Sequence, residues 1–299
     1  MNTQAVSLFI NPTAGRGRAG LRAPRIQEIL AGAGITCRLQ MSNGVGDLER
    51  QVCDATRNGA DRIIVAGGDG SIHEAVNGLM RSESSAALGI IPTGTGNDFA
   101  KACAIPLDWE KATRQLVERL SGHSTVRYID VGRVNDRFFA NGVGIGFDAK
   151  VTRVARSYRW PVGDIVYLLA IFRCMMDGIA TPELTIRSDE FDWRGPVTLA
   201  NVSNGAWVGG MFHIAPMARN NDGKLELLIA APVSRLRILS LLPKIIRGTH
   251  LREAEITHSS VQRLVVKAAE PVPSHLDGEV QALESTFDIE VLPAALGLL

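Results

Sequence analysis

The sequence predicts a two-domain protein, with an α/β N-terminal domain built on a parallel sheet and a β-rich C-terminal sandwich domain. In the N-terminal part, short apolar runs alternate with helical patterns, which is typical of right-handed β-α-β units. After about Tyr128 the chain consists mainly of strand-like runs joined by turns, which indicates antiparallel sheets. The expected divisions are 1–125, 126–293 and a tail, 294–299, that could return to the first domain.

The individual elements follow from local patterns of apolar residues. Strands in the first domain are expected at the runs AVSLFI, ITCRLQM, RIIVAGG and LGIIPTG. Helices are expected between them at 23–33, 45–57 and 72–81. Strands in the second domain are expected at IDVGRV, RFFANGVGIGF, ELTIRS, VTLANVSN, LELLIA, VQRLVVKA and TFDIEVLP. Two helical patterns, 151–179 and 234–247, interrupt these strands.

Composition excludes several classes of protein. Lys and Arg total 32 against 31 for Asp and Glu, so the net charge of +1 gives no general attraction to nucleic acid. The cysteines, at 37, 53, 103 and 174, lie too far apart to indicate a disulfide scaffold or a cysteine metal site. The most apolar stretch, 165–172, is too short to span a bilayer. We expect a cytoplasmic protein that touches a membrane only from the side.

Three glycine-rich or polar turns each follow an expected strand of the first domain. They are NPTAGRG at 11–17, GGDGS at 67–71 and PTGTGND at 92–98. Ligands of open α/β sheets bind at the carboxyl ends of the strands, so all three turns could line one crevice. None has the Gly-Lys-Ser/Thr ending of a Walker A loop, and none is a dinucleotide G-x-G-x-x-G after the first strand.

The turn at 67–71 is the strongest local signal for a ligand. Its glycines let the backbone approach a phosphate, and the expected helix that follows offers unpaired N–H groups. Asp69 would repel phosphate oxygens unless a divalent cation such as Mg²⁺ lies between them. In the alternative interpretation Asp69 is a turn residue and Ser71 is a helix N-cap.

Taken together, these turns and several later segments resemble the diacylglycerol kinase catalytic-domain family, which includes bacterial soluble lipid kinases and the sphingosine and ceramide kinases. The resemblance covers nearly the whole chain, and GGDG combined with GTGNDFA is specific, although GGDG alone is shared with NAD kinases. The segments are NPTAGRGRA (11–19), GGDGSIHEAVNGL (67–79), LGIIPTGTGNDFAKA (88–102), IDVGRVNDRFFANGVGIGFDA (129–149), APMARNNDGKLEL (215–227) and HLDGEV (275–280).

The resemblance implies an NAD kinase/diacylglycerol kinase-like fold and an ATP site in the first domain. Ser42 and Ser71 stand where the family usually has Thr, and both keep the hydroxyl group. The residues implied in nucleotide binding are Asn11, Pro12, Thr13, Ala14, Gly15, Ser42, Gly67, Gly68, Asp69, Gly70, Ser71, Thr95, Asn97 and Asp98.

Two Mg²⁺ sites are also expected. Asp69, Asp98 and Asp130 are expected to form an acidic cluster that holds Mg²⁺ through water near the ATP phosphates. The resemblance implies a second, structural Mg²⁺ at 219–224, where Asp222 would supply a carboxylate and the carbonyls of Arg219 and Lys224 further oxygens. An N-N-D-G run is by itself a strong turn signal.

The triplet Asp277-Gly278-Glu279 is the catalytic element that the resemblance implies. Glu279 would act as general base toward the lipid hydroxyl, with Asp277 as a Mg²⁺ or network partner. A carboxylate base suits phosphoryl transfer, which depends mainly on alignment and charge neutralisation. Without the resemblance, a hairpin turn between two strands is the favoured interpretation of D-G-E.

Two segments combine basic and apolar residues in the way that a membrane surface requires. The first has Arg153, Arg156 and Arg159 at three-residue spacing before Trp160, and the second is 235–247. For both, a core helix with a solvated basic edge is the alternative.

We therefore expect an ATP-dependent, Mg²⁺-dependent lipid kinase that makes transient peripheral contact with the membrane. Its acceptor would be diacylglycerol or a related lipid, and a homodimer is a possible assembly. The alternatives are an NAD kinase-like enzyme and a non-catalytic nucleotide or lipid sensor on the same fold.

Overall fold

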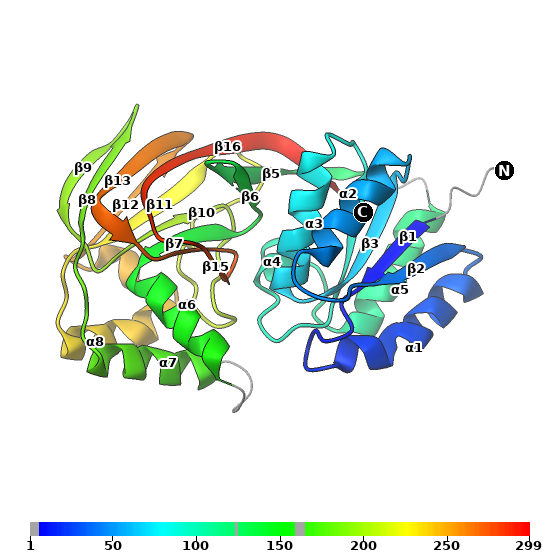
Figure 1. The fold of residues 1–299 in the computed structure, drawn as a ribbon, viewed down its shortest axis with the longest axis horizontal. Helices are drawn as coiled ribbons and strands as arrows, with labels where there is room; N and C mark the ends of the chain where they lie inside the picture. Colours follow the sequence, from blue (N-terminus) through cyan, green and yellow to red (C-terminus); the bar gives the residue numbers. More distant parts are fainter. Residues whose placement is uncertain (1–5, 123–124, 159–164) are drawn as a thin grey trace. The chain divides into compact units, whose positions relative to one another are not determined.

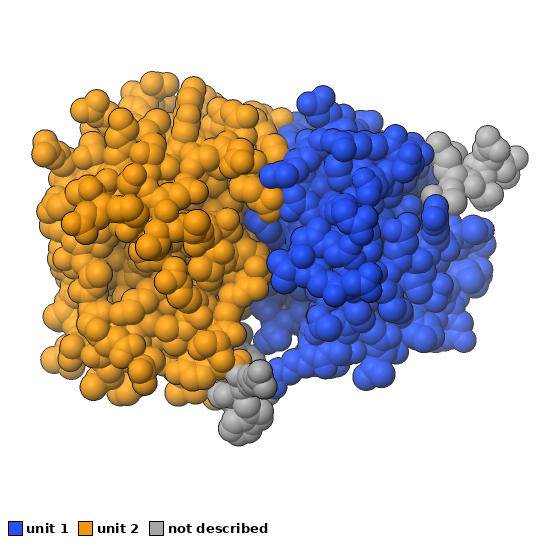
Figure 2. Space-filling view, viewed as in Figure 1, with its two compact units in different colours: residues 1–129, 294–299 blue, residues 130–293 orange. Residues whose placement is uncertain are grey.

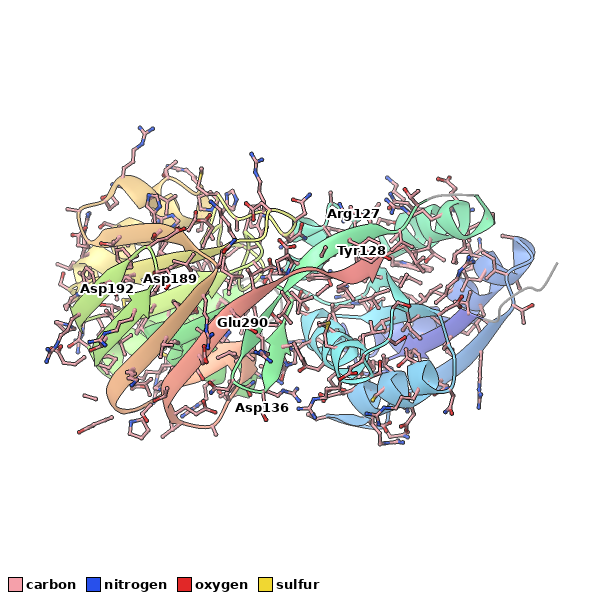
Figure 3. The ribbon with its side chains drawn as sticks, turned by 90° about the horizontal axis from the view of Figure 1, so that it is seen from above. Arg127, Tyr128, Asp136, Asp189, Asp192 and Glu290 are labelled. Carbon is pink, nitrogen blue, oxygen red and sulfur yellow. The ribbon has the colours of Figure 1, made fainter. Side chains whose placement is uncertain are left out.

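The protein consists of two compact units. The structure is a computed structural model that describes residues 6–122, 125–158 and 165–299. Unit 1 contains residues up to 129 together with 294–299, and unit 2 contains 130–293 (Figure 2). Two strands that pair with each other, β5 (Arg127–Val134) and β16 (Glu284–Leu298), each contain residues of both units. Figure 3 labels Arg127 and Tyr128 on β5 and Glu290 on β16.

The first four strands are parallel to one another, in the order β2-β1-β3-β4. Their side chains are mostly buried, as expected for a parallel sheet covered on both faces. The strands are β1 (Val6–Ile10), β2 (Cys37–Met41), β3 (Arg62–Gly67) and β4 (Ala87–Pro92). The predicted α/β fold with a parallel sheet is confirmed.

Five helices accompany these strands in the described part of unit 1 (Figure 1). They are α1 (Arg18–Gly32), α2 (Asp47–Arg57), α3 (Asp69–Arg81), α4 (Asp98–Ala102) and α5 (Trp109–Ser121). Ile26 and Leu30 of α1 and Leu116 of α5 share one apolar cluster with β1. These two helices therefore cover one face of the sheet.

Two differences from the expected helices bear on the site. Helix α3 begins at Asp69 rather than near 72, so the second half of the GGDG turn forms the start of the helix. Helices α4 and α5 were not predicted. Asp108 was a sequence signal for α5, because aspartate is a preferred helix N-cap residue. In the structure its carboxylate accepts the N–H of Lys111 at 2.8 Å.

Unit 2 is a sandwich of two mainly antiparallel sheets, which confirms the predicted C-terminal architecture. One sheet has the order β12-β11-β10-β7-β14-β15, and β13, β8 and β9 continue the other beyond β16. Apolar side chains from both sheets, such as Val202 and Phe287, form one core. The strands are β6 (Arg137–Phe139), β7 (Gly142–Gly146), β8 (Glu183–Ser188), β9 (Asp192–Pro196), β10 (Leu199–Ser203), β11 (Leu225–Ala230), β12 (Ile256–Val261), β13 (Arg263–Val272), β14 (Ser274–Leu276) and β15 (Glu279–Val280).

Three helices pack together on one side of this sandwich (Figure 1). They are α6 (Phe147–Ser157), α7 (Ile165–Met176) and α8 (Arg235–Ile246), and a short 3₁₀ turn, η1 (His250–Arg252), follows. The single helical pattern expected at 151–179 thus corresponds to two helices. Arg159 and Trp160 lie outside the described residues. None of the described helices has the length and apolar character needed to cross a membrane.

The C-terminal end of β16 is part of unit 1. Leu298 pairs in parallel with Leu88 of β4, and the N–H of Leu299 donates to the Leu88 carbonyl at 3.0 Å. The Leu298 side chain is only 1% exposed. The last strand therefore adds apolar burial to the edge of the parallel sheet.

We predict that Leu298→Ala lowers the free energy of unfolding by about 2–5 kcal/mol, because the truncation removes buried methyl groups and leaves a cavity. Urea unfolding followed by circular dichroism measures the change. The control is Leu283→Ala, whose side chain is 56% exposed and whose loss should change stability by less than about 0.5 kcal/mol. Equal effects of the two substitutions would contradict the assignment of Leu298 to the core of unit 1.

Candidate functional site

The three turns of unit 1 meet at the carboxyl ends of their strands. A Cβ added to Gly94 would lie 2.5 Å from the Cα of Gly68, and one added to Gly15 would lie 2.0 Å from the carbonyl oxygen of Thr93. Gly15 also has a left-handed φ of 59°. Glycine at these positions therefore lets the three backbones touch.

Side chains then fasten each turn. Nδ2 of Asn11 donates to Oγ of Ser71 at 3.0 Å, which joins the first turn to the second. Oδ1 of Asn11 accepts from the N–H and the hydroxyl of Thr13. Asn97 closes the third turn, because its amide exchanges two hydrogen bonds with the backbone of Gly94. Asn11 and Asn97 thus hold the loops in shape, whatever they bind.

The start of α3 is the strongest candidate for a phosphate site. Gly68 occupies the N-cap position in an extended conformation, with no side chain capping the helix. The first backbone bond back to the cap comes from Ile72, whose N–H donates to the Gly68 carbonyl. The N–H groups of the first turn and the helix dipole favour an anion at this end.

Ser71 is therefore not a helix N-cap, and that alternative is wrong. It is the third residue of α3, is buried, and its hydroxyl faces Asn11. The N-cap is Gly68, because the helix starts three residues earlier than the apolar pattern indicates.

The carboxylates of Asp69 and Asp98 both lie at the start of α4, although Asp69 is a residue of α3. Oδ1 of Asp69 accepts the N–H of Phe99 at 3.1 Å, so a residue of α3 caps the next helix. Asp98 is the first residue of α4, is 7% exposed, and has Oδ1 3.3 Å from Nζ of Lys101. Carboxylate oxygens of this kind are suitable ligands for Mg²⁺, directly or through water.

Asp130, the third member of the expected acidic cluster, belongs to unit 2. Its Oδ2 accepts the N–H of Gly223 at 2.7 Å, and its own N–H donates to the Asn220 carbonyl. Asp130 therefore contacts the 219–224 loop, where Oδ1 of Asp222 accepts the N–H of Lys224. The oxygen donors of this loop suit a hard cation. The described residues nevertheless contain no group of three or more His, Cys, Asp or Glu side chains placed to hold a metal.

The D-G-E triplet forms a tight hairpin between β14 and β15. Asp277 and Gly278 have left-handed φ values of 50° and 84°, as the hairpin interpretation of the sequence requires. The Asp277 carboxylate accepts three backbone N–H groups, from residues 140, 141 and 142, at 2.7–2.9 Å. This carboxylate therefore fixes the hairpin to the turn before β7.

Glu279 is the carboxylate of the triplet that remains partly accessible. Its side chain is 26% exposed, and Oε2 lies 2.5 Å from Nη1 of Arg156 on α6. The same guanidinium donates to the Gly278 carbonyl at 3.0 Å. Arg156 therefore neutralises the proposed base and fastens the hairpin to α6.

His275 is a buried histidine that the sequence analysis did not select. It is 1% exposed, and its Nε2 lies 3.1 Å from Oδ2 of Asp148 on α6, in the arrangement of an ion pair rather than a well-aligned hydrogen bond. Gly278 N–H donates to Nδ1 at 3.3 Å, so the neutral ring carries its proton on Nε2. Burial lowers the pKa of His275, but Asp148, with Asp277 and Glu279, raises it by more, so the net pKa lies above the usual value.

The pair fits because residue 144 is glycine. A Cβ at Gly144 would lie 2.2 Å from Oδ2 of Asp148 and 2.3 Å from Nε2 of His275. Both partners lie in segments that carry the family resemblance. The position of His275 two residues before Asp277 of the D-G-E triplet was the signal that could have identified it.

Unit 2 also contains an apolar pocket beside this pair. It is lined by residues of α6, α7 and α8 and of strands β10 and β11, including Phe147, Tyr167 and Leu228. The polar side chains in its wall are Asp148, Thr198 and His250. Asp148 therefore belongs both to the pocket and to the pair with His275.

The fold is that of a two-domain protein with an α/β unit and a β-sandwich unit, and comparison with known proteins identifies its family as one of kinases. Residues 5–134 match the family model "Diacylglycerol kinase catalytic domain", and residues 141–299 match "YegS C-terminal NAD kinase beta sandwich-like domain". The chain belongs to this family of diacylglycerol kinases and YegS-like lipid kinases, as the sequence motifs indicated.

Individual relatives are similar over most of their length. The chain is 30% identical to the diacylglycerol kinase of Bacillus subtilis (strain 168) over 91% of this chain and 88% of the relative. It is 33% identical to a probable lipid kinase YegS-like protein of Pectobacterium atrosepticum, over 88% and 86%. A solved diacylglycerol kinase structure from Bacillus anthracis str. Sterne has a TM-score of 0.74 at 23% identity, covering 99% of this chain and 96% of that chain, which supports the fold.

We predict that Asp277→Asn destabilises the protein by about 1–3 kcal/mol, because the asparagine amide must turn N–H groups toward backbone donors that then lack an acceptor. Thermal unfolding measures the loss. The matched control is Asp136→Asn, an exposed aspartate on the turn between β5 and β6, which should leave the midpoint unchanged (Figure 3). An unchanged midpoint for Asp277→Asn would show that the three N–H groups do not depend on this carboxylate.

Proposed function

We propose that the protein transfers the γ-phosphate of ATP to a hydroxyl group of diacylglycerol or a related lipid, in a Mg²⁺-dependent reaction at the membrane surface. The family supports ATP as the co-substrate. The observation that carries the choice of a lipid acceptor is the apolar pocket of unit 2, with the polar Asp148 in its wall. A pocket of this composition suits acyl chains and gives a dinucleotide few hydrogen bonds.

Unit 1 would hold the nucleotide. The first-turn N–H groups of α3 would bind phosphate oxygens, and the turns that Asn11 and Asn97 brace would line the rest of the site. Mg²⁺, held through water by Asp69 and Asp98, would neutralise charge on the phosphates. Ser42, which follows β2 and is buried, would add a hydroxyl contact.

Unit 2 would supply the base and bind the lipid acceptor. Glu279 would take the proton from the lipid hydroxyl as the phosphoryl group is transferred in line. Arg156 contacts Oε2 of Glu279 at 2.5 Å, so the other carboxylate oxygen, Oε1, would accept the proton from the hydroxyl. The contacts of Asp277 and His275 with the hairpin would keep Glu279 in position during the transfer.

We predict that Glu279→Gln lowers turnover by about 100-fold or more and leaves ATP affinity unchanged, because the amide keeps the shape of the carboxylate but cannot accept the proton. The readout is phosphate transfer to whichever lipid the wild type phosphorylates, with ATP binding measured by calorimetry. Glu270→Gln, at an exposed glutamate of β13, is the matched control and should behave as wild type. Equal rates for Glu279→Gln and the control would exclude Glu279 as the base.

A further inference from the structure

Helix α7 is apolar on its exposed side as well as on its buried side. Ala170, Ile171, Cys174 and Met175 point into the protein and are buried. Four large side chains at spacings of four, three and four residues form an exposed stripe. They are Ile165 (56% exposed), Leu169 (44%), Phe172 (57%) and Met176 (60%). A surface helix normally places polar residues on this side, so the stripe needs a partner.

Helix α8 extends this apolar surface. Leu236 is 80% exposed and Leu239 is 44% exposed. Figure 1 shows α7 and α8 next to each other along the same side of unit 2. The two helices also share one apolar cluster and both line the pocket of unit 2. We call the six exposed side chains of α7 and α8 the outer face.

The charges around the outer face have one predominant sign, although the whole chain is almost neutral at +1. Helices α6, α7 and α8 contain seven basic side chains and one acidic side chain, Asp148. The basic residues are Lys150, Arg153, Arg156, Arg173, Arg235, Arg237 and Lys244.

Several of these cations have carboxylate partners. Arg156 pairs with Glu279, Arg173 with Asp177, and Arg237 and Lys244 pair with Glu253, with Glu255 also on Arg237. Arg153 and Arg235 are exposed, and the described part of the chain forms no ion pair with either. Arg235 directly precedes Leu236 in the chain, so unneutralised positive charge lies next to the outer face.

We infer that the outer face docks the protein onto the surface of an anionic lipid bilayer. Apolar side chains that enter the interface, with basic groups at their border, match the chemistry of such a surface. In a twofold dimer built on this face, by contrast, the basic borders would meet each other. The pocket lies directly behind the stripe, since Ile171 lines it while Phe172 points outward.

This inference rests on the proposed function for its substrate, but its test does not require catalysis. The full chain is sedimented with vesicles of phosphatidylglycerol and phosphatidylcholine, and with vesicles of phosphatidylcholine alone. The wild type should bind the anionic vesicles more tightly, and added salt should weaken binding because it screens the charges. Equal binding to both vesicles would overturn the inference.

The decisive variant is Leu169→Gln combined with Phe172→Gln, with Leu21→Gln as control, since Leu21 is 84% exposed on α1. The double variant should lose about tenfold or more in vesicle affinity, and the control should bind as wild type. Unchanged thermal midpoints should show that all three proteins are folded. Undiminished binding by the double variant, or a lipid-free wild-type dimer that this variant converts to monomer, would contradict membrane docking.

Kinetics separate a failure of docking from a failure of the proposed function. Where the wild type phosphorylates a short-chain diacylglycerol dispersed as monomers, the double variant should do so at the same rate. When the same lipid is presented in vesicles, the double variant should phosphorylate it more slowly than the wild type. An equal loss on both substrates would place Leu169 and Phe172 in lipid binding rather than docking and overturn the inference. Vesicle binding without transfer to any lipid would leave docking standing and reject the proposed function.

Discussion

The candidate nucleotide site of unit 1 depends on the close backbone contact between two turns, which only glycine permits. Gly68 and Gly94 approach so closely that a side chain on either would meet the backbone of the other. Because of this contact, the start of α3 and the turn that leads into α4 lie against each other, and Asp69 can cap α4. The same contact brings the carboxylates of Asp69 and Asp98 to the region where α3 begins. The proposed phosphate site and the proposed Mg²⁺ ligands would thereby lie together, as phosphate transfer requires.

In unit 2 the hairpin between β14 and β15 is held in place by charged side chains. A hairpin of two short strands would be mobile by itself. Here three side chains hold it, since Asp277 binds the backbone before β7, His275 contacts Asp148, and Glu279 pairs with Arg156. Two of these contacts end on α6, which also forms a wall of the apolar pocket. Helix α6 would therefore contact the lipid in the pocket and also position the proposed base.

Much of this architecture could be predicted from the sequence, because alternating apolar runs define both the parallel sheet and the sandwich. Boundaries were less predictable, since the GGDG turn contains no apolar residue to show that α3 already begins at Asp69. The sequence also offered D-G-E as either a hairpin or a catalytic element, and the structure shows the hairpin without excluding the second role. Contacts between residues far apart in the chain, such as Arg156 with Glu279 and Asp148 with His275, leave no local pattern and could not be predicted.

The proposed reaction transfers the γ-phosphate of ATP to a lipid hydroxyl. The most direct test is transfer of labelled γ-phosphate from ATP with Mg²⁺ to a panel of lipids in mixed micelles, with NAD as the rival acceptor and Asp69→Ala as the inactive control. We predict a labelled lipid that disappears with Asp69→Ala and no labelled NADP, as the proposed reaction requires. Labelled NADP, or ATP binding without transfer to any lipid of the panel, would contradict it.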